Sequence, residues 1–188
     1  MSSHHIVREN QEPALIVDSI DDLSEEYIGQ LLEWSPTIFV SEQTLNYFLQ
    51  RDIKVDFLIS SNPQTTPLQQ DIKVLLLEKG VITDALEYLC SNDYKAANII
   101  SSIIPKNIEE YCWRINLVFF SEQRKYVCVC GSYEKWQIKG AKIYVDENVV
   151  VSMNGLKTVG ENVLESIDEG FFSLLLEPGK YITIGEEI

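Results

Sequence analysis

The sequence lacks the features on which several functional classes depend. It has 15 Lys and Arg residues against 29 Asp and Glu residues, a formal net charge of −14. Such a surface repels phosphate backbones and anionic lipids, so we expect no nucleic-acid partner and no membrane partner. No apolar run approaches the roughly 20 residues that cross a bilayer, and the N-terminal residues contain no apolar signal segment. These absences predict a cytoplasmic protein.

Histidine is nearly absent, and cysteine is sparse. His4 and His5 are the only histidines, so the rest of the chain offers no imidazole to activate a catalytic Ser or Cys. The spacing of the four cysteines fits neither a zinc ribbon nor a zinc finger. They are Cys90, Cys112, Cys128 and Cys130. We interpret them as buried, reduced thiols, with a metal site or a disulfide as the alternatives.

The first half of the chain alternates strand-like and helix-like runs. Strand-like runs are expected at 14–17, 37–40, 55–60, 72–77 and 97–101, with helices at 18–34, 42–52 and 81–93. Asp21 or Ser24 can cap the first helix. The run 72–77 is so apolar that we expect both of its faces to be covered. This alternation predicts a Rossmann-like, mostly parallel, three-layer α/β domain over residues 13–104.

The second half contains short strand-like runs separated by turn signals. These runs are RINLVFFS, KYVCVCG, AKIYVD, NVVVSMNG, FFSLLL and KYITIG. Period-2 patterns and short spacings replace the helical patterns of the first half. We therefore predict a C-terminal antiparallel β-sandwich domain over residues 108–188.

Six stretches carry a resemblance to a known family. They are EPALIV, GQLLEWSPTIFV, IKVDFLIS, DALEYLCSNDYKAANII, YEKW and NGLK. Together they resemble thiamine pyrophosphokinases, particularly the bacterial ones, over nearly the whole chain. The resemblance implies a homodimer, with sites near the subunit interface, that transfers a diphosphate from ATP to thiamine with Mg²⁺. That chemistry requires carboxylates, because the metal ions must bridge the phosphate oxygens.

At the positions of that family's catalytic motifs, this sequence has different residues. Its D-G-G-A-N-like turn falls on residues 42–46, where Glu42 replaces the aspartate, both glycines are gone and only Asn46 matches. Its G-D-x-D-S loop falls on residues 60–64, so Ser61 and Pro63 stand where two metal-binding aspartates are expected. A serine is neutral, and a proline supplies no ligand and lacks an amide donor. The resemblance therefore implies a dismantled phosphate site.

Two further motifs and one turn also differ from the family's pattern. The K-D-x-T-D segment falls on residues 78–81, although a slipped register matches Thr83 and Asp84 to its last two residues. No Arg-x-Asp-His occurs between residues 101 and 111. The first strand ends in Asp18-Ser19-Ile20 instead of a glycine-containing turn, and a side chain there either fills the phosphate volume or forbids positive φ.

Nine residues remain as candidates for ligand binding, and none is assigned a catalytic or metal-ligating role. They are Asp18, Glu42, Asn46, Asp56, Ser60, Ser61, Gln64, Trp136 and Ser173. Asp18 and Glu42 either form a relocated metal pair or help to cap the following helices. Asp56 matches an acid of the family's I-x-P-D step and is expected to order the loop.

Each candidate in the second half can be interpreted either as a binding residue or as a structural one. Trp136 either stacks on an aromatic ligand or covers the sheet. Ser173 lies near where the family has a substrate-contacting S-N pair, but Leu174 replaces the asparagine. Three lysines give this half a local positive charge or a solvated face: Lys135, Lys139 and Lys142.

Three hypotheses for function follow. The first is a thiamine pyrophosphokinase-like homodimer that binds neither Mg²⁺ nor ATP but retains either a pocket for thiamine or a related small molecule or a regulatory role. The second is an active diphosphotransferase that uses Mg²⁺ and ATP through Asp18, Glu42, Asp56 and either Glu78 or Asp84. The third is a dimeric interaction module assembled through its β half.

Overall fold

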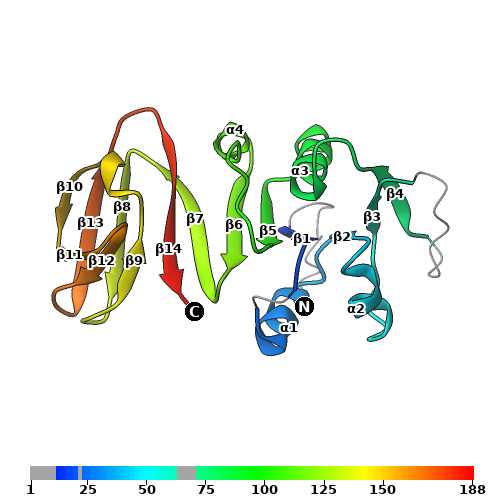
Figure 1. The fold of residues 1–188 in the computed structure, drawn as a ribbon, viewed down its shortest axis with the longest axis horizontal. Helices are drawn as coiled ribbons and strands as arrows, with labels where there is room; N and C mark the ends of the chain where they lie inside the picture. The colour runs from blue at the N-terminus through cyan, green and yellow to red at the C-terminus, as the bar shows by residue number, and fades with distance from the viewer. Residues whose placement is uncertain (1–11, 21–22, 63–70) are drawn as a thin grey trace, which may run out of the picture.

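The computed structural model describes residues 12–20, 23–62 and 71–188. Five residues named above lie outside these ranges: His4, His5, Asp21, Pro63 and Gln64. The molecule is elongated, with one large sheet running along its length (Figure 1). Helices flank the sheet at one end, and a smaller sheet packs at the other end.

Six parallel strands form the first part of the large sheet, in the order β4, β3, β2, β1, β5, β6. They are β1 (Ala14–Val17), β2 (Ile38–Ser41), β3 (Phe57–Ser60), β4 (Lys73–Leu76), β5 (Ala96–Ile100) and β6 (Asn116–Ser121). β1, β2 and β3 are buried along their whole length, as expected for parallel strands covered on both faces.

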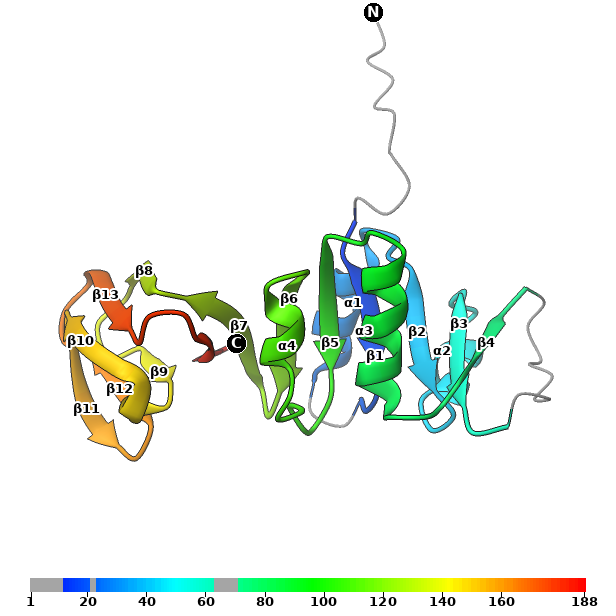
Figure 2. The ribbon, with the colours of Figure 1, turned by 90° about the horizontal axis from the view of Figure 1, so that it is seen from above.

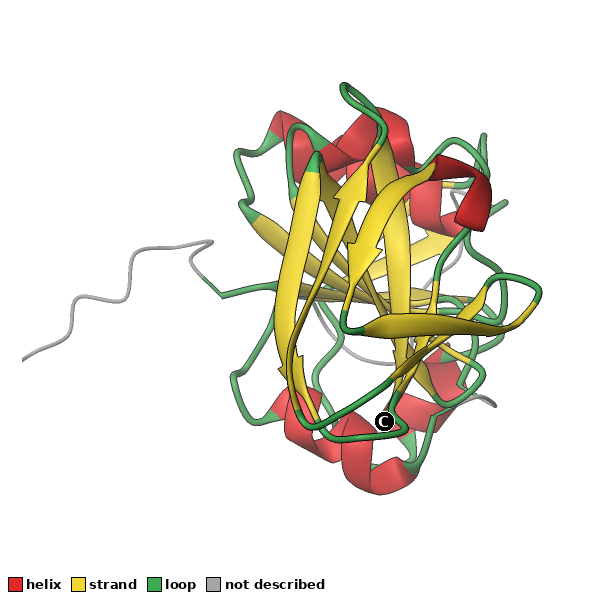
Figure 3. Cartoon of the chain, turned by 90° about the vertical axis from the view of Figure 1, so that its left-hand side faces the viewer, coloured by secondary structure: helices red, strands yellow, loops and turns green. Residues whose placement is uncertain are grey.

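Four helices cover the two faces of this parallel region (Figures 2 and 3). They are α1 (Glu25–Leu32), α2 (Leu45–Leu49), α3 (Val81–Ser91) and α4 (Glu109–Cys112). α1 and α2 pack on one face through Ile28 and Phe48, whereas α3 and α4 pack on the other. α1 begins after Ser24, whose Oγ accepts a hydrogen bond from the Tyr27 amide at 3.3 Å.

Antiparallel strands continue the large sheet beyond β6. In spatial order they are β7 (Arg124–Cys130), β14 (Tyr181–Glu187), β9 (Lys142–Tyr144), β12 (Val163–Ser166) and β11 (Leu156–Gly160). The small sheet contains β10 (Val150–Asn154), preceded by the short 3₁₀ helix η1 (Glu147–Val149), with β13 (Gly170–Leu176) and β8 (Ser132–Gln137). Phe172 and Leu174 of β13 share a buried cluster with Ile143 and Ile184 of the large sheet.

The predicted mixed α/β fold with a large sheet is confirmed. The backbone ladder runs without interruption from β5 through β6 to β7, so the predicted boundary between two domains is crossed by one sheet. The sequence patterns missed four elements: β8, β11, β12 and α4. Each is short or has one solvated face, so its apolar periodicity is weak.

One expectation about a strand is wrong. The run 72–77 was expected to be covered on both faces, but β4 is the last strand of the large sheet. Lys73 is exposed, and the Leu76 side chain is 46% exposed. An apolar run identifies a strand, but it does not show whether the strand lies in the middle of the sheet, where both faces are covered, or at the edge of the sheet.

The interpretation of all four cysteines as buried, reduced thiols is also wrong. Cys112 of α4 and Cys128 of β7 form a disulfide, with their Cα atoms 6.3 Å apart. Cys130 is an exposed free thiol and Cys90 is a partly buried one. Burial raises the pKa of the Cys90 thiol. The bridge fastens α4 to the strand where the sheet changes from parallel to antiparallel pairing.

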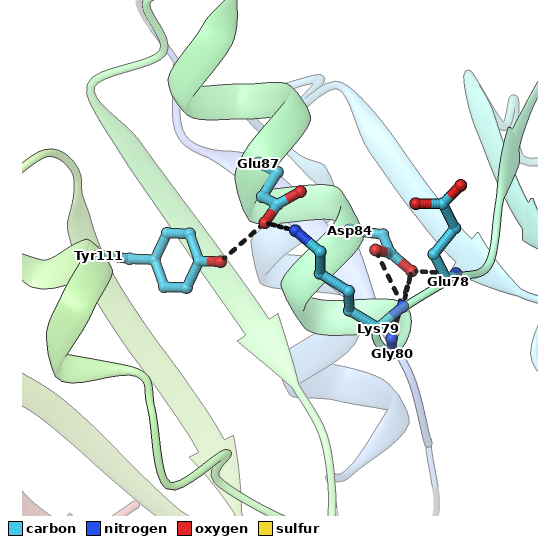
Figure 4. Close-up of polar contacts among 6 residues, drawn as sticks. All are labelled: Glu78, Lys79, Gly80, Asp84, Glu87 and Tyr111. Carbon is cyan, nitrogen blue, oxygen red and sulfur yellow. Dashed lines mark hydrogen bonds and ion pairs between the residues drawn. The ribbon is translucent and has the colours of Figure 1, made fainter.

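The loop before α3 is closed by a side chain from inside the helix (Figure 4). The Asp84 carboxylate accepts hydrogen bonds from the amides of Glu78 at 2.9 Å, Lys79 at 3.1 Å and Gly80 at 3.2 Å. Gly80 has φ +134°, a conformation that side-chain-bearing residues rarely adopt. Asp84 thus ties the loop that precedes α3 to the first turn of the helix.

No helix among the described residues is long and apolar enough to cross a bilayer.

Breaking the disulfide should destabilise the fold. Because the bridge joins residues 16 apart, Cys112→Ser should lower the free energy of unfolding by about 3 kcal/mol, measured by denaturant titration. A thiol assay on the denatured, unreduced protein should find two thiols, and four after reduction. Cys130→Ser is the matched control, and equal unfolding midpoints for the two variants would contradict the prediction.

Removing the Asp84 carboxylate should weaken the start of α3. We expect Asp84→Ala to lower the free energy of unfolding by about 1 kcal/mol, the range typical of a lost helix cap. Glu78→Ala removes the same charge from an exposed position in the same loop. If Glu78→Ala is as destabilising as Asp84→Ala, the effect comes from net charge and not from the bonded amides.

Candidate functional site

The carboxyl ends of the parallel strands meet at one edge of the sheet. Asp18 follows β1, Glu42 follows β2, Ser60 ends β3 and Ser101 follows β5. In open α/β sheets this edge is where ligands bind. Because β1 and β2 are neighbours, Asp18 and Glu42 lie on adjacent strands, as the sequence predicts.

The two carboxylates nevertheless bond in opposite directions. The Glu42 Oε1 atom accepts a hydrogen bond from the hydroxyl of Ser60 on β3 at 2.6 Å. The Asp18 Oδ2 atom accepts one from the hydroxyl of Ser101, beyond β5, at 3.0 Å. Since the strand order is β5, β1, β2, β3, each acid reaches away from the other. The arrangement pairs each carboxylate with a hydroxyl of its own scaffold.

The turn after β2 is fastened to the end of β1 by two buried hydroxyls. Thr44 Oγ1 donates to the Val17 carbonyl at 2.9 Å and accepts from the Ser41 amide at 3.1 Å. Ser41 Oγ donates to the Asp18 carbonyl at 3.2 Å. Sequence reasoning overlooked Ser41, Thr44 and Ser101. The Ser-x-x-Thr spacing ahead of a helix was the available signal for the first two.

Ser19 differs from the other hydroxyls at this edge. Its Oγ atom is buried and has no hydrogen-bond partner within the described part of the chain. Its backbone amide donates to the Ile100 carbonyl at 3.3 Å. Asn46, on α2, and Ser61, after β3, are both exposed beside this edge.

The structure does not bring the rearranged acid set together. Asp56 precedes β3 and therefore lies at the opposite, amino edge of the sheet. There its carboxylate accepts from the Ile38 amide at 3.0 Å and pairs with Lys54 at 2.8 Å. This contact orders the loop, as expected. The Asp84 carboxylate is occupied by three amides of its own loop (Figure 4).

Two hollows open at this amino edge, on either side of Asp56. Their volumes are about 540 and 450 Å³, and they share Thr37, Lys54 and Asp56. The lining charges balance in number, with Lys54 and Asp56 in both hollows and Lys73 and Asp71 in the second, so neither hollow has an excess of one sign. None of the other candidates lines them.

The candidates of the second half lie far from the carboxyl edge. Trp136 on β8 and Ser173 on β13 belong to the small sheet, at the other end of the molecule from β1 and β2 (Figure 1). Trp136 is paired across strands with Phe171, and their side chains are 45% and 67% exposed. Trp136 therefore faces outward and does not cover the core of its half.

The three lysines considered in the sequence, Lys135, Lys139 and Lys142, are paired with acids. Lys135 pairs with Glu186, Lys139 with Asp168 at 3.4 Å and Lys142 with Glu187 at 3.5 Å. The expected local positive charge is therefore offset by neighbouring acids. Tyr133 also donates to Glu186 at 3.1 Å, and burial together with this carboxylate raises the pKa of Tyr133 above its ordinary value.

Metal-ligating side chains do not gather within residues 12–20, 23–62 and 71–188. No group of three or more His, Cys, Asp or Glu side chains that could hold a metal ion occurs there.

Comparison with known proteins rests on structure alone. No family model matches the sequence, and no curated protein matches it. Among solved structures, thiamin pyrophosphokinase from Geobacillus thermodenitrificans superposes with a TM-score of 0.62 at 12% identity, covering 93% of this chain and 97% of that one. Thiamin pyrophosphokinase from Candida albicans gives 0.62 at 11% identity, covering 94% and 90%.

A third match comes from another bacterium. Thiamine pyrophosphokinase from Bacillus subtilis gives a TM-score of 0.59 at 12% identity, covering 94% of this chain and 99% of that one. The similarity spans both halves of the molecule, and identities this low establish the fold alone. The resemblance is thereby confirmed at the level of the fold: this chain has the fold of the thiamine pyrophosphokinases, at 11–12% identity to these three structures.

Proposed function

We propose that this protein is a non-catalytic relative of the thiamine pyrophosphokinases, built on their Rossmann-like and sandwich-like halves and without a working Mg²⁺–ATP site. The observation that carries the proposal is the pairing of both edge carboxylates with scaffold hydroxyls, Glu42 with Ser60 and Asp18 with Ser101. A metal ion that bridges phosphates needs carboxylate oxygens converging on one point. Here they diverge.

Electrostatics support the same conclusion. ATP brings several negative charges to a chain whose formal net charge is −14. Among the described residues of the loops beyond this edge, Lys79 is paired with Glu87 and Lys106 is a single cation, so they form no basic cluster that offsets the repulsion. Ser61, the described position that replaces one of the family's aspartates, is neutral and cannot anchor the ion. The residues present therefore do not fit Mg²⁺–ATP.

A binding role for thiamine or a related small molecule would require two chains. Within one molecule, β5, β6 and β7 separate β1 and β2 from the half that carries the small sheet (Figure 1). Trp136 and Ser173 can meet Asp18 and Glu42 only across an interface between two copies. We therefore propose a homodimer in which the small sheet of one chain faces the carboxyl edge of its partner.

The active enzyme is the second candidate, and the geometry disfavours it. Its metal set needs Asp56 and Glu78 or Asp84 beside Asp18 and Glu42. Asp56 lies at the other edge of the sheet, and Asp84 closes its own loop. An interaction module is the third candidate, and it is favoured by the exposed apolar face around Phe171.

The cellular location forms part of the proposal. We expect a cytoplasmic protein, and there a disulfide such as Cys112–Cys128 is usually transient and regulated rather than permanent.

Calorimetric titration tests the proposal directly. ATP and thiamine are each titrated with and without magnesium, and we expect no magnesium-dependent heat from ATP because the edge carboxylates do not converge. The Bacillus subtilis thiamine pyrophosphokinase, titrated in parallel, serves as the positive control. Heat from thiamine alone would indicate a surviving acceptor pocket, whereas silence with both ligands favours the interaction module.

The same titration can overturn the proposal. If ATP produces heat only with magnesium, the active-enzyme candidate replaces it. In that case Glu42→Gln should abolish both the heat and any formation of thiamine diphosphate, since it removes one of the two edge charges.

The homodimer has its own test. By light scattering, the native protein should have twice the chain mass of 21.5 kDa, and Phe171→Glu should shift it towards the monomer because a charge would enter an apolar interface. Val159→Glu on β11, where the native side chain is 47% exposed, is the matched control and should stay dimeric. A monomeric native protein would exclude a site shared between chains.

A further inference from the structure

A third hollow, of about 470 Å³, lies beside α1 on one face of the large sheet. Asn98 of β5, Val118 of β6 and Lys125 of β7 form its floor, and Tyr27 and Trp34 stand on the side of α1. The elements that surround it, α1, β5, β6 and β7, are labelled in Figure 1. None of the candidates considered above lines it.

The strand register explains why the floor residues share one face. Val118 pairs with Asn98 on one side and with Val127 on the other, and Phe120 pairs with Lys125. Directly paired residues point to the same side of a sheet. On this side α1 and α2 cover β1 and its neighbours, whereas Val127 already packs against the cluster beneath the small sheet. The hollow occupies the gap between these two covers.

The walls of the hollow suit a flat aromatic molecule. The rings of Tyr27 and Phe120 lie 5.4 Å apart between centroids, tilted by 55°. Trp34 stands at the rim with 69% of its surface exposed. The volume falls within the range of about 300–1,000 Å³ that is usual for small-molecule sites. Exposed aromatic surface around such a hollow favours ring stacking.

Asn98 is a polar residue in an otherwise apolar part of the sheet. It lies in mid-strand on an apolar face, beside Leu15, which is fully buried, and two residues before Ile100. Within the described ranges, no residue forms a hydrogen bond with its side-chain amide. Asn98 is partly exposed in the hollow, so its amide, which offers two donors and one acceptor, is open to a ligand there.

Lys125 supplies a positive charge at the same floor. No carboxylate of the described chain lies within ion-pair distance of its ammonium group. Its cross-strand neighbour Glu186 is held instead by Lys135 and Tyr133. The cation is therefore available to an anionic group in the hollow.

We propose that this hollow binds a small planar aromatic monocarboxylate. The ring lies against Tyr27, Trp34 and Phe120, and the carboxylate accepts hydrogen bonds from Lys125 and from the amide of Asn98. The negative net charge of the chain does not prevent this, because salt screens charges beyond about 8 Å while Lys125 acts at contact. Glu12, which also lines the hollow, disfavours a second negative group on the ligand.

Titration calorimetry of the full chain with naphthoate tests the proposal. Naphthalenemethanol and naphthylmethylamine have the same ring with a neutral or a positive group. We expect naphthoate to bind about tenfold or more tightly than the alcohol, since the charged hydrogen bonds are lost with the alcohol. Lys125→Met should reduce the affinity for naphthoate to that for the alcohol and leave the alcohol unaffected. Lys139→Met, at a distant exposed lysine, is the control.

A second variant separates binding from folding. Asn98→Val should leave the melting temperature unchanged or raise it, because an apolar side chain suits that face, while weakening naphthoate binding. The proposal is overturned if naphthoate produces no heat at millimolar concentration or if the amine binds as tightly as the acid. It is also overturned if Lys125→Met binds naphthoate normally, or if Asn98→Val destabilises the fold without changing affinity.

Discussion

Backbone hydrogen bonding by β6 is the constraint on which the whole structure depends. This strand pairs in parallel with β5 on one edge and antiparallel with β7 on the other. A single ladder of backbone hydrogen bonds therefore joins both halves. The first half has parallel strands covered by helices, and the second has antiparallel strands that pack against a second sheet. The disulfide between Cys112 and Cys128 lies at this junction and fastens α4 to β7. The two halves cannot separate without breaking the ladder.

Hydroxyl groups dominate the edge at which this fold offers a ligand site. Ser60 and Ser101 each donate to an acid, and Thr44 donates to the end of β1. Polar groups that satisfy one another need neither metal nor phosphate to be stable. The Ser19 hydroxyl is the exception within the described chain, since it is buried without a partner. The hydroxyls of Ser60, Ser101 and Thr44 are therefore bonded within the scaffold itself.

Candidate residues were identified from the sequence more readily than the distances between them. Asp18 and Glu42 were correctly placed on neighbouring strands, because strands that follow one another in the chain usually pair in the sheet. The direction in which each carboxylate bonds depends on Ser60 and Ser101, which belong to other strands. Asp56 was grouped with these acids by the resemblance, although one strand length separates the two edges of a sheet. The hollow above Asn98 could not be predicted from the sequence, because it lies in the gap between α1 and α2 on one side and the small sheet on the other.

The sequence by itself determined the mixed α/β class, the apolar runs that form β1, β2 and β3, and two candidate caps for α1, of which Ser24 accepts the capping hydrogen bond. These follow from local periodicity, turn chemistry and residue identity, which need no partner elsewhere in the chain. Only the tertiary structure decided that β4 is an edge strand, that Cys112 meets Cys128 and that Asn98 and Lys125 share a floor. Each of these depends on contact between segments far apart in the chain, and such contacts are set by packing and strand register.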